Sequence, residues 1–195
     1  MKLLLISDAE CKALWDYFQP ERLNGISAII SCGDLKREYL EFLVTLGKLP
    51  LFYVPGNHDE RYTVDPPGGC DCLDDTLTVF EGVRMIGFGG CKWYGGGTYQ
   101  YTEKEMRKRV RKAHRAIKKA GGVDIVVTHA AMQGYGDAPD AAHQGFACFR
   151  ELVDEWKPKF FVHGHMHGTY GNIPRRLRYG ETEVVNAFER YVIET

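Results

Sequence analysis

Short apolar runs rich in β-branched residues recur along the chain and are separated by polar segments. Runs of this length that stay apolar throughout are typical of strands buried on both faces of a sheet. The pattern predicts such strands at residues 3–6, 26–30, 51–54, 83–88, 123–127, 160–162, 184–185 and 191–193.

Between several of these runs, apolar residues recur at the spacing of a helix face. This periodicity predicts helices over residues 36–46, 102–120 and 145–156, and a shorter one near residues 11–18. The clearest begins at Thr102, which forms a capping box with Glu105, and ends before Gly121 and Gly122. Because strands and helices alternate, we expect the α/β class, which some schemes would assign to α+β.

Three further segments are rich in glycine, proline or polar residues without strong periodicity, and we expect surface loops at residues 65–75, 89–101 and 130–144. Several aromatic residues stand among the glycines of the second loop, namely Trp93, Tyr94, Tyr99 and Tyr101. These rings either close the loop over the core, which we favour, or stack on a nucleotide base.

The chain has 195 residues, 44% of them hydrophobic and 26% charged, as expected of a single globular domain over residues 1–195. Its formal net charge of −1 creates no global field that would recruit nucleic acid or an anionic membrane. The first apolar run is too short for a secretory signal, and no run approaches membrane-spanning length. We therefore expect a cytoplasmic protein without a membrane partner, and the sequence leaves its oligomeric state open.

The cysteines are scattered beside apolar runs, without the paired spacing of a zinc ribbon or the density of a disulfide-rich domain. They are Cys11, Cys32, Cys70, Cys72, Cys91 and Cys148. We expect reduced cysteines that pack in the interior. Only the cluster at residues 70–72 keeps a metal or redox role open.

The predicted helix over residues 102–120 has a strongly basic face opposite its apolar side. The basic residues are Lys104, Arg107, Lys108, Arg109, Arg111, Lys112, Arg115, Lys118 and Lys119. Such a face is most often a solvated helix surface, and the alternative is contact with the phosphates of a polyanion. We favour the solvated surface and keep nucleic acid as the alternative partner.

Residue types that commonly bind metals follow five of the predicted strands. In chain order they are Asp8, Asp34, Asn57 with His58 and Asp59, His129, and His163 with His165 and His167. Because ligands bind beyond the carboxyl ends of strands in open α/β sheets, we expect these side chains to meet at one sheet edge. A mixed set of Asp, Asn and His suits Mn, Fe or Zn better than Ca or Mg.

Each of these residues alone has an ordinary structural explanation. An aspartate after a strand is commonly a helix cap or a turn former, and a single histidine there is commonly a hydrogen-bonded edge residue. Five such strand ends in one short chain are difficult to explain by packing, because buried imidazoles and carboxylates need partners. Shared metal coordination would provide those partners.

The ordered motifs resemble those of the calcineurin-like metallophosphoesterases, in particular small bacterial members known only as predicted phosphoesterases. The shared motifs are Asp8 after the first strand, Gly33-Asp34, Gly56-Asn57-His58-Asp59, the isolated His129 and Gly164-His165-Met166-His167. The resemblance spans residues 8–167 and implies a four-layer α/β/β/α sandwich of two mixed β-sheets flanked by helices.

The same resemblance implies two divalent or trivalent metal ions, drawn from Mn, Fe and Zn. One ion would take Asp8, Asp34 and His167, and the other would take Asp34, Asn57, His129 and His165. The family usually has a histidine two residues after its first aspartate, where this chain has Glu10. Glu10 either ligates the first metal through oxygen or turns away and leaves a weaker or empty first site.

The implied reaction is hydrolysis of a small phosphate ester, either a monoester or a diester, by a hydroxide that bridges the metals. In this mechanism His58 assists the leaving group and Asp59 orients the His58 ring. The Gly-Asp motif continues as Leu-Lys-Arg at residues 35–37, unlike the Val-Asp-Arg-Gly of protein Ser/Thr phosphatases. A protein-phosphatase role is therefore disfavoured.

Two other functions stay open as alternatives. Glu10 is compatible with a non-catalytic protein-interaction domain, and the basic helix is compatible with a phosphoesterase directed at nucleic acid. In the loop at residues 130–144, Asp137, Asp140 and His143 either line the substrate pocket, as in the small bacterial members, or are ordinary loop polarity.

Overall fold

Two β-sheets form the centre of the computed structural model, which describes residues 1–168 and 174–195. Sheet A contains, in spatial order, β13 (Tyr191–Glu194), β1 (Lys2–Ile6), β2 (Ala28–Ser31), β3 (Leu51–Tyr53) and β4 (Asp71–Cys72). Sheet B contains β11 (Arg176–Tyr179), β12 (Thr182–Asn186), β10 (Phe160–His163), β9 (Ile125–Thr128), β6 (Val83–Phe88) and β5 (Leu77–Phe80). A separate parallel pair consists of β7 (Cys91–Lys92) and β8 (Gln100–Tyr101).

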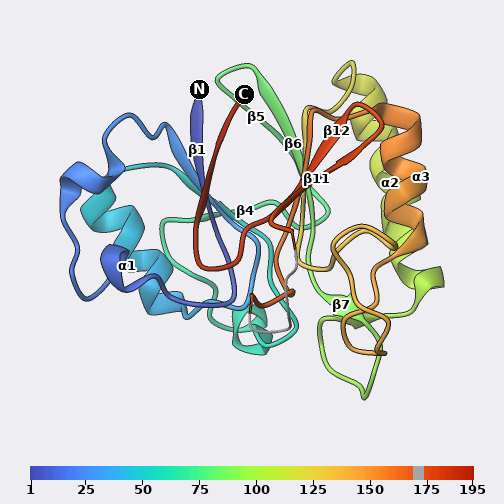
Figure 1. Cartoon of the computed structure of the whole chain (residues 1–195), viewed down its shortest axis with the longest axis horizontal. Helices are drawn as coiled ribbons and strands as arrows, with labels where there is room; N and C mark the ends of the chain where they lie inside the picture. Colours follow the sequence, from blue (N-terminus) through green and yellow to red (C-terminus); the bar gives the residue numbers. More distant parts are fainter. Residues whose placement is uncertain (169–173) are drawn as a thin grey trace.

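Helices cover the outer faces of both sheets (Figure 1). The helix α1 (Arg37–Gly47) and two 3-10 turns, Lys12–Leu14 and Pro20–Leu23, lie on the sheet A side. The helices α2 (Glu103–Lys119) and α3 (Ala147–Trp156) lie on the sheet B side. A third 3-10 turn, Glu60–Thr63, comes after β3. This α/β/β/α layering confirms the predicted fold. Within the described part of the chain, none of the helices combines the length and apolar character needed to cross a membrane.

Apolar side chains fill the space between the sheets and the spaces beneath the helices. Leu5 and Ile30 of sheet A belong to the same buried cluster as Val127 and Val162 of sheet B. A second cluster joins sheet B to α2 and α3, and a third joins sheet A to α1. The central strands contact apolar residues on both faces, which explains why their sequences are apolar throughout.

The central strands of each sheet run parallel. In sheet A the parallel strands include β1, β2 and β3, and in sheet B they include β6, β9, β10 and β12. The strands β13, β11 and β5 pair antiparallel and lie at sheet edges. The loops that follow the parallel strands therefore emerge together, at the lower side of the molecule in Figure 1.

Most predicted elements appear within a few residues of their expected positions, and the differences lie in exposed or edge segments. The predicted loops at residues 65–75 and 89–101 contain the short strands β4, β7 and β8, and the edge strands β5 and β11 lie outside the predicted set. Neither edge strand forms an apolar run, because both have exposed positions. The helix predicted near residues 11–18 is wrong: only the 3-10 turn Lys12–Leu14 forms, because the buried positions there do not continue as a stripe.

The six cysteines are unpaired, as expected for reduced thiols. Cys11, Cys32, Cys91 and Cys148 are buried among apolar side chains. Cys70 and Cys72 are more exposed.

Candidate metal centre

The loops after five parallel strands bring the predicted ligand residues to one edge of the sandwich. Asp8 follows β1, Asp34 follows β2 and Asn57 follows β3, all in sheet A. From sheet B, His129 follows β9, and both His165 and His167 follow β10. The candidate ligands thus come from both sheets and meet where the sheets face each other.

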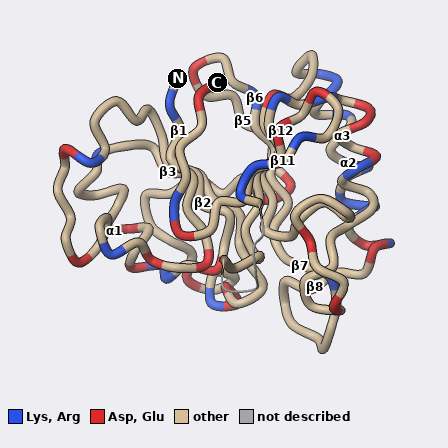
Figure 2. Tube along the Cα trace, in the orientation of Figure 1, with Lys and Arg blue, Asp and Glu red and all other residues tan. Residues whose placement is uncertain are grey.

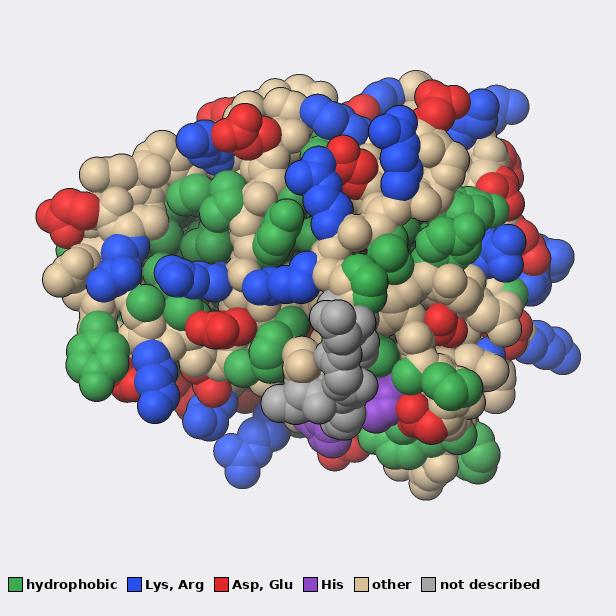
Figure 3. All heavy atoms as spheres, viewed as in Figure 1, with side chains coloured by type: hydrophobic (Ala, Val, Ile, Leu, Met, Phe, Trp, Pro, Cys, Tyr) green, Lys and Arg blue, Asp and Glu red, His purple; other side chains and the backbone are tan. Residues whose placement is uncertain are grey.

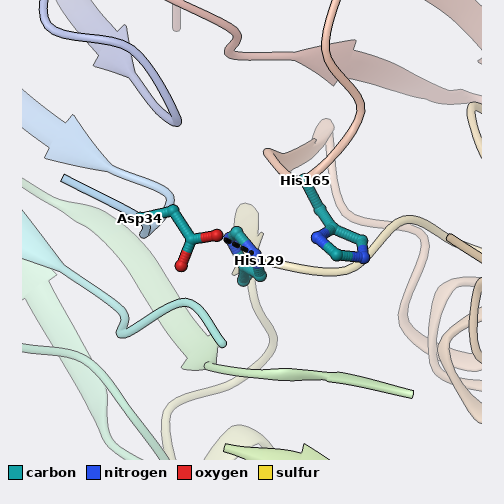
Figure 4. A group of neighbouring side chains, drawn as sticks. All are labelled: Asp34, His129 and His165. Atoms are coloured by element: carbon teal, nitrogen blue, oxygen red, sulfur yellow. Dashed lines mark ion pairs between the residues drawn. The ribbon is translucent and has the colours of Figure 1, made fainter. Parts of the chain in front are cut away.

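Asp34, His129 and His165 form the centre of this group and point toward one another (Figure 4). One potential ligand atom from each residue lies within 4.8 Å of the others. The Oδ2 of Asp34 is 3.4 Å from the Nε2 of His129, and the Oδ1 of Asn57 is 3.0 Å from the same nitrogen. Four residues of the predicted second metal set therefore surround one point.

Backbone carbonyls fix which imidazole nitrogens can bind a metal. The Nδ1 of His129 is 2.7 Å from the carbonyl oxygen of Cys32, and the Nε2 of His165 is 2.7 Å from that of Ala142. A carbonyl only accepts hydrogen bonds, so each of these nitrogens must carry the proton. The other nitrogens, Nε2 of His129 and Nδ1 of His165, are left to bind a metal, because carbonyls placed in this way orient metal-binding histidines.

The electrostatics of this centre favour a positive charge. Burial disfavours the charged form of Asp34, but His129 and the backbone N–H of His58 outweigh burial and hold the pKa of the carboxyl well below its usual range. Burial likewise lowers the pKa of His129, and Asp34 overcomes it and raises that pKa to about 9. Burial, reinforced by His129, lowers the pKa of His165 to about 4 and keeps this imidazole neutral. A metal cation in the place of the proton on the Nε2 of His129 would interact favourably with the same two oxygens, the Oδ2 of Asp34 and the Oδ1 of Asn57.

Asp8, His167 and Glu10 lie beside this centre. The two carboxylate oxygens of Asp8 both accept from the backbone N–H of His165 at 3.0 Å, and Oδ1 is 3.5 Å from the Nε2 of His167. The carboxylate of Glu10 pairs with the Nζ of Lys36 at 3.4 Å. The structure thus brings Asp8 and His167 together and gives Glu10 a cationic partner.

His58 and Asp59 have different surroundings. The backbone N–H of His58 donates to the Oδ1 of Asp34 at 2.8 Å, and its side chain is exposed. The buried carboxylate of Asp59 accepts from the backbone N–H groups of Asp34 and Gly56, at 2.8 and 2.7 Å. Among the described residues, the hydrogen bonds of this carboxylate reach the backbone and not the His58 ring. Asp59 therefore ties the loop after β2 to the loop after β3.

The motif glycines allow the ligand loops to approach one another closely. A side chain at Gly56 would place its Cβ 2.0 Å from the Oδ1 of Asp34, and one at Gly164 would meet the Oγ of Ser7 at 1.9 Å. Asp8, Asp34 and His165 adopt positive φ angles of 65°, 56° and 64°. This conformation is uncommon for residues other than glycine, and three candidate ligands share it.

Tyr94 is a site residue that the sequence pattern did not single out as one. Its hydroxyl accepts a hydrogen bond from the Nδ2 of Asn57 at 3.2 Å, while the Oδ1 of Asn57 faces His129. The loop that carries Tyr94 is held by Gln100, whose Oε1 accepts from three consecutive backbone N–H groups. Aromatic residues in a glycine-rich segment were the only sequence signal. Trp93 and Tyr94 are 57% and 38% exposed, so the packing favoured for these two rings is wrong.

The loop between β9 and α3 contributes mainly through its backbone. Both carboxylate oxygens of Asp137 accept from N–H groups of the loop itself, those of Gly134 and Gly145. Asp140 binds the Nδ1 of His143 at 2.8 Å, and the His143 ring lies 4.9 Å from the ring of His165. Asp137 and Asp140 therefore order the loop, and His143 borders the metal centre.

A cavity of about 450 Å³ opens beside the centre. Its walls include Asp8, Asp34 and His58 from the motifs, and Glu10 and Lys36. Arg61, which is exposed, also lines it. In Figure 3, histidine side chains reach the surface at the same lower edge of the molecule. The cavity has the size of a small-molecule site and contains groups of both charges.

Comparisons with known proteins agree with this architecture. A family model described as the calcineurin-like phosphoesterase superfamily domain matches residues 1–187. The crystal structure of TT1561 of Thermus thermophilus superposes with a TM-score of 0.66 at 17% identity, covering 96% of this chain and 89% of that one. GAP50, the anchor in the inner membrane complex of Plasmodium, gives 0.55 at 11% identity, covering 95% and 70%. At these identities the likeness to the solved structures shows the fold alone. No curated protein matches at a significant level.

Proposed function

The chain belongs to the calcineurin-like phosphoesterase superfamily, and from this membership we propose that it hydrolyses phosphate esters at a centre of two metal ions. The observation that carries the proposal is the convergence of Asp34, Asn57, His129 and His165 on one point. Both imidazoles in this set have their other nitrogen occupied by a backbone carbonyl. Metal-binding histidines almost always donate their other ring N–H in this way, which aims the free nitrogen at the ion.

The two ions would be held with different strength. Asp34, Asn57, His129 and His165 would hold the second ion, as a set of four protein ligands. Asp8, Asp34 and His167 would hold the first ion, so Asp34 would contribute to both sites. Because Glu10 is paired with Lys36, we assign the first ion three protein ligands and a weaker hold. Mn, Fe or Zn suits this mixture of oxygen and nitrogen donors.

Bound metal ions supply an activated water and neutralise charge on the phosphoryl oxygens. The protein holds the geometry: Asp59 fixes the backbone of Asp34 and Gly56, and the carbonyls of Cys32 and Ala142 fix the two imidazoles. His58 is exposed in the cavity wall and adjacent to Asn57, where its imidazole can give a proton to the leaving oxygen. The substrate is a small phosphate ester that fits the cavity beside Lys36.

The direct test measures metals per chain together with hydrolysis of a bis-aryl phosphate and an aryl phosphate, after loading with Mn, Fe, Zn or Mg. We expect two metals per chain and metal-dependent turnover. His165→Ala should lose the tightly held ion and the activity. His114→Ala is the matched control, because His114 pairs with Glu155 on the helices and lies outside the centre.

A second candidate function is a protein-interaction domain without catalysis, which the Glu10–Lys36 pair favours because it removes one expected ligand from the first ion. A folded chain that binds no metal and turns over neither ester would support this candidate. One metal or two with turnover would exclude it.

A further inference from the structure

The outward face of α2 carries a row of basic side chains, most of which form no ion pair within the described part of the chain. Two of the cations of the helix are accounted for: Arg107 pairs with Glu103 and Glu151, and Arg109 pairs with Asp74 and Asp75. The others are exposed and have no ion pair among residues 1–168 and 174–195, namely Lys104, Lys108, Arg111, Lys112, Arg115, Lys118 and Lys119. Blue segments recur along α2 in Figure 2.

The spacing of these cations lowers the stability of the helix. Lys104, Lys108 and Lys112 follow one another at four-residue spacing, and so do Arg111, Arg115 and Lys119. Like charges at this spacing are neighbours on the helix surface and destabilise it. Lys104 also lies in the first turn, where the helix dipole disfavours a cation. An anionic ligand along this face would relieve both effects.

A shallow groove of about 470 Å³ runs along the same face. Its lining consists mainly of carbon atoms of five basic residues, namely Lys104, Arg107, Lys108, Arg111 and Lys112. From Lys104 to Lys119 the row is about 22 Å long at the rise of an α-helix, the axial length of roughly six phosphates on one strand of a duplex. The face thus fits an extended anion with regularly spaced charges better than a single small one.

The burial of the other side of α2 distinguishes between extended anions. Helices that lie on anionic membranes insert an apolar face between the lipids. In α2 that face, formed by Met106, Val110, Ala113 and Ile117, is buried against sheet B. No apolar side of α2 is therefore left to insert between lipids, whereas contacts with a nucleic-acid backbone need no insertion. We propose that the basic face of α2 binds the phosphate backbone of nucleic acid, without reading its bases.

The proposal goes beyond ester hydrolysis and is tested without metals. In the presence of a chelator, fluorescence anisotropy measures the binding of a labelled oligothymidine and of a labelled DNA duplex at several salt concentrations. The test variant is the triple change Lys108→Gln, Arg111→Gln and Lys112→Gln. The matched control is Lys12→Gln, Arg22→Gln and Lys48→Gln, which removes the same charge from exposed positions in the two 3-10 turns beside sheet A and at the end of α1.

We expect salt-sensitive binding by the wild-type chain and by the control. The α2 variant should bind at least tenfold more weakly, and the slope of log affinity against log salt should fall by about 2, as expected for three lost phosphate contacts on a single strand. Equal losses in the two triple variants, no binding by the wild-type chain at low salt, or tighter binding to phosphatidylserine vesicles would overturn the proposal. Circular dichroism of each variant checks that α2 stays helical.

Discussion

Tyr94 reaches the metal centre through a single hydrogen bond, and this bond holds the Asn57 amide in place beside His129. With its Nδ2 on the Tyr94 hydroxyl, Asn57 turns its Oδ1 toward the ligand nitrogen 3.0 Å away. Tyr94→Phe removes the acceptor and frees the amide to rotate. We expect metal affinity at the tighter site to fall about 10- to 100-fold, the usual effect of losing a side chain that hydrogen-bonds to a metal ligand.

Titration with Co²⁺, followed by its absorption spectrum, measures this loss independently of turnover. Tyr99→Phe is the control, because Tyr99 belongs to the same loop and its hydroxyl has no hydrogen bond to a candidate ligand within the described residues. Equal Co²⁺ affinity in the wild-type chain and Tyr94→Phe would show that the bond to Asn57 does not orient it.

His58 differs from its neighbours in being exposed at the cavity wall while its backbone is fixed on Asp34. His58→Ala should therefore leave metal binding nearly intact and lower the rate of hydrolysis about 10²- to 10⁴-fold, the typical contribution of a general acid. The loss should be smaller for an aryl ester, whose leaving group needs less protonation, than for an alkyl ester. Full activity toward the alkyl ester would remove His58 from the mechanism.

At the scale of single residues, the sequence identifies which residue types belong to the site but does not predict which of them contact one another. The glycines and ligands of the motifs are visible because each follows a strand-like run. The motif includes Asp59 as well, but the sequence does not predict that its carboxylate joins two loops. The carboxylate accepts from the backbone N–H groups of Asp34 and Gly56, which are distant from each other in sequence. The contact of Tyr94 with Asn57 spans 37 positions. The bond from Gly56 to Asp59 is local, but no local pattern in the chain encodes the bond from Asp34 to Asp59 or the bond between Asn57 and Tyr94.

At the scale of elements, the Arg84–Asp124 pair joins the start of β6 to the turn before β9. Asp124 accepts from the Nε and Nη2 of Arg84 at 2.8 and 2.6 Å and from its backbone N–H at 2.8 Å. Bonding to Arg84 outweighs partial burial and lowers the pKa of Asp124. The pair is partly exposed, so after allowance for screening Asp124→Asn should cost about 1 kcal/mol of unfolding free energy at neutral pH.

The pH dependence of this effect has a definite sign. Because the folded-state pKa of Asp124 is depressed, its contribution is complete above the ordinary carboxyl pKa of about 4 and is lost as pH falls below that value. In urea unfolding, the free energies of unfolding of the wild type and of Asp124→Asn should differ at neutral pH and become equal in acid. Asp71→Asn, at an exposed position in β4, should show no such difference. A constant difference at every pH would indicate lost packing rather than lost charge.

Elements buried on both faces are those that the sequence predicts well. The apolar runs of β1, β2, β3, β9 and β10 appear where expected because each contacts two layers. α2 is predicted down to its capping box, which is local: Thr102 and Glu105 bond each other across one turn. β5 and β11 lack this signal since both strands have exposed or only half-buried positions. Their strand conformation comes from pairing with β6 and β12.

For the whole molecule, the sequence does not state which strands share a sheet, because an apolar run is compatible with either sheet. The resemblance to the calcineurin-like family predicted two sheets, and the strand pairing in the structure confirms them. Only that arrangement makes the candidate centre a link between sheets. Asp8, Asp34 and Asn57 come from sheet A, whereas His129, His165 and His167 come from sheet B.

A metal that binds this centre should therefore stabilise the entire sandwich. The folded chain offers converging ligands from both sheets and the unfolded chain does not, so metal at about 1,000 times its Kd should add about 4 kcal/mol of unfolding free energy. Chelation should lower the thermal midpoint, and adding back Mn²⁺ or Zn²⁺ should raise it with increasing concentration. His165→Ala removes one sheet B ligand and should abolish most of the shift, whereas His114→Ala should keep it. A thermal midpoint insensitive to every metal in a folded chain would mean that these six residues do not form a metal centre, because ligands held across two sheets cannot bind an ion without opposing their separation.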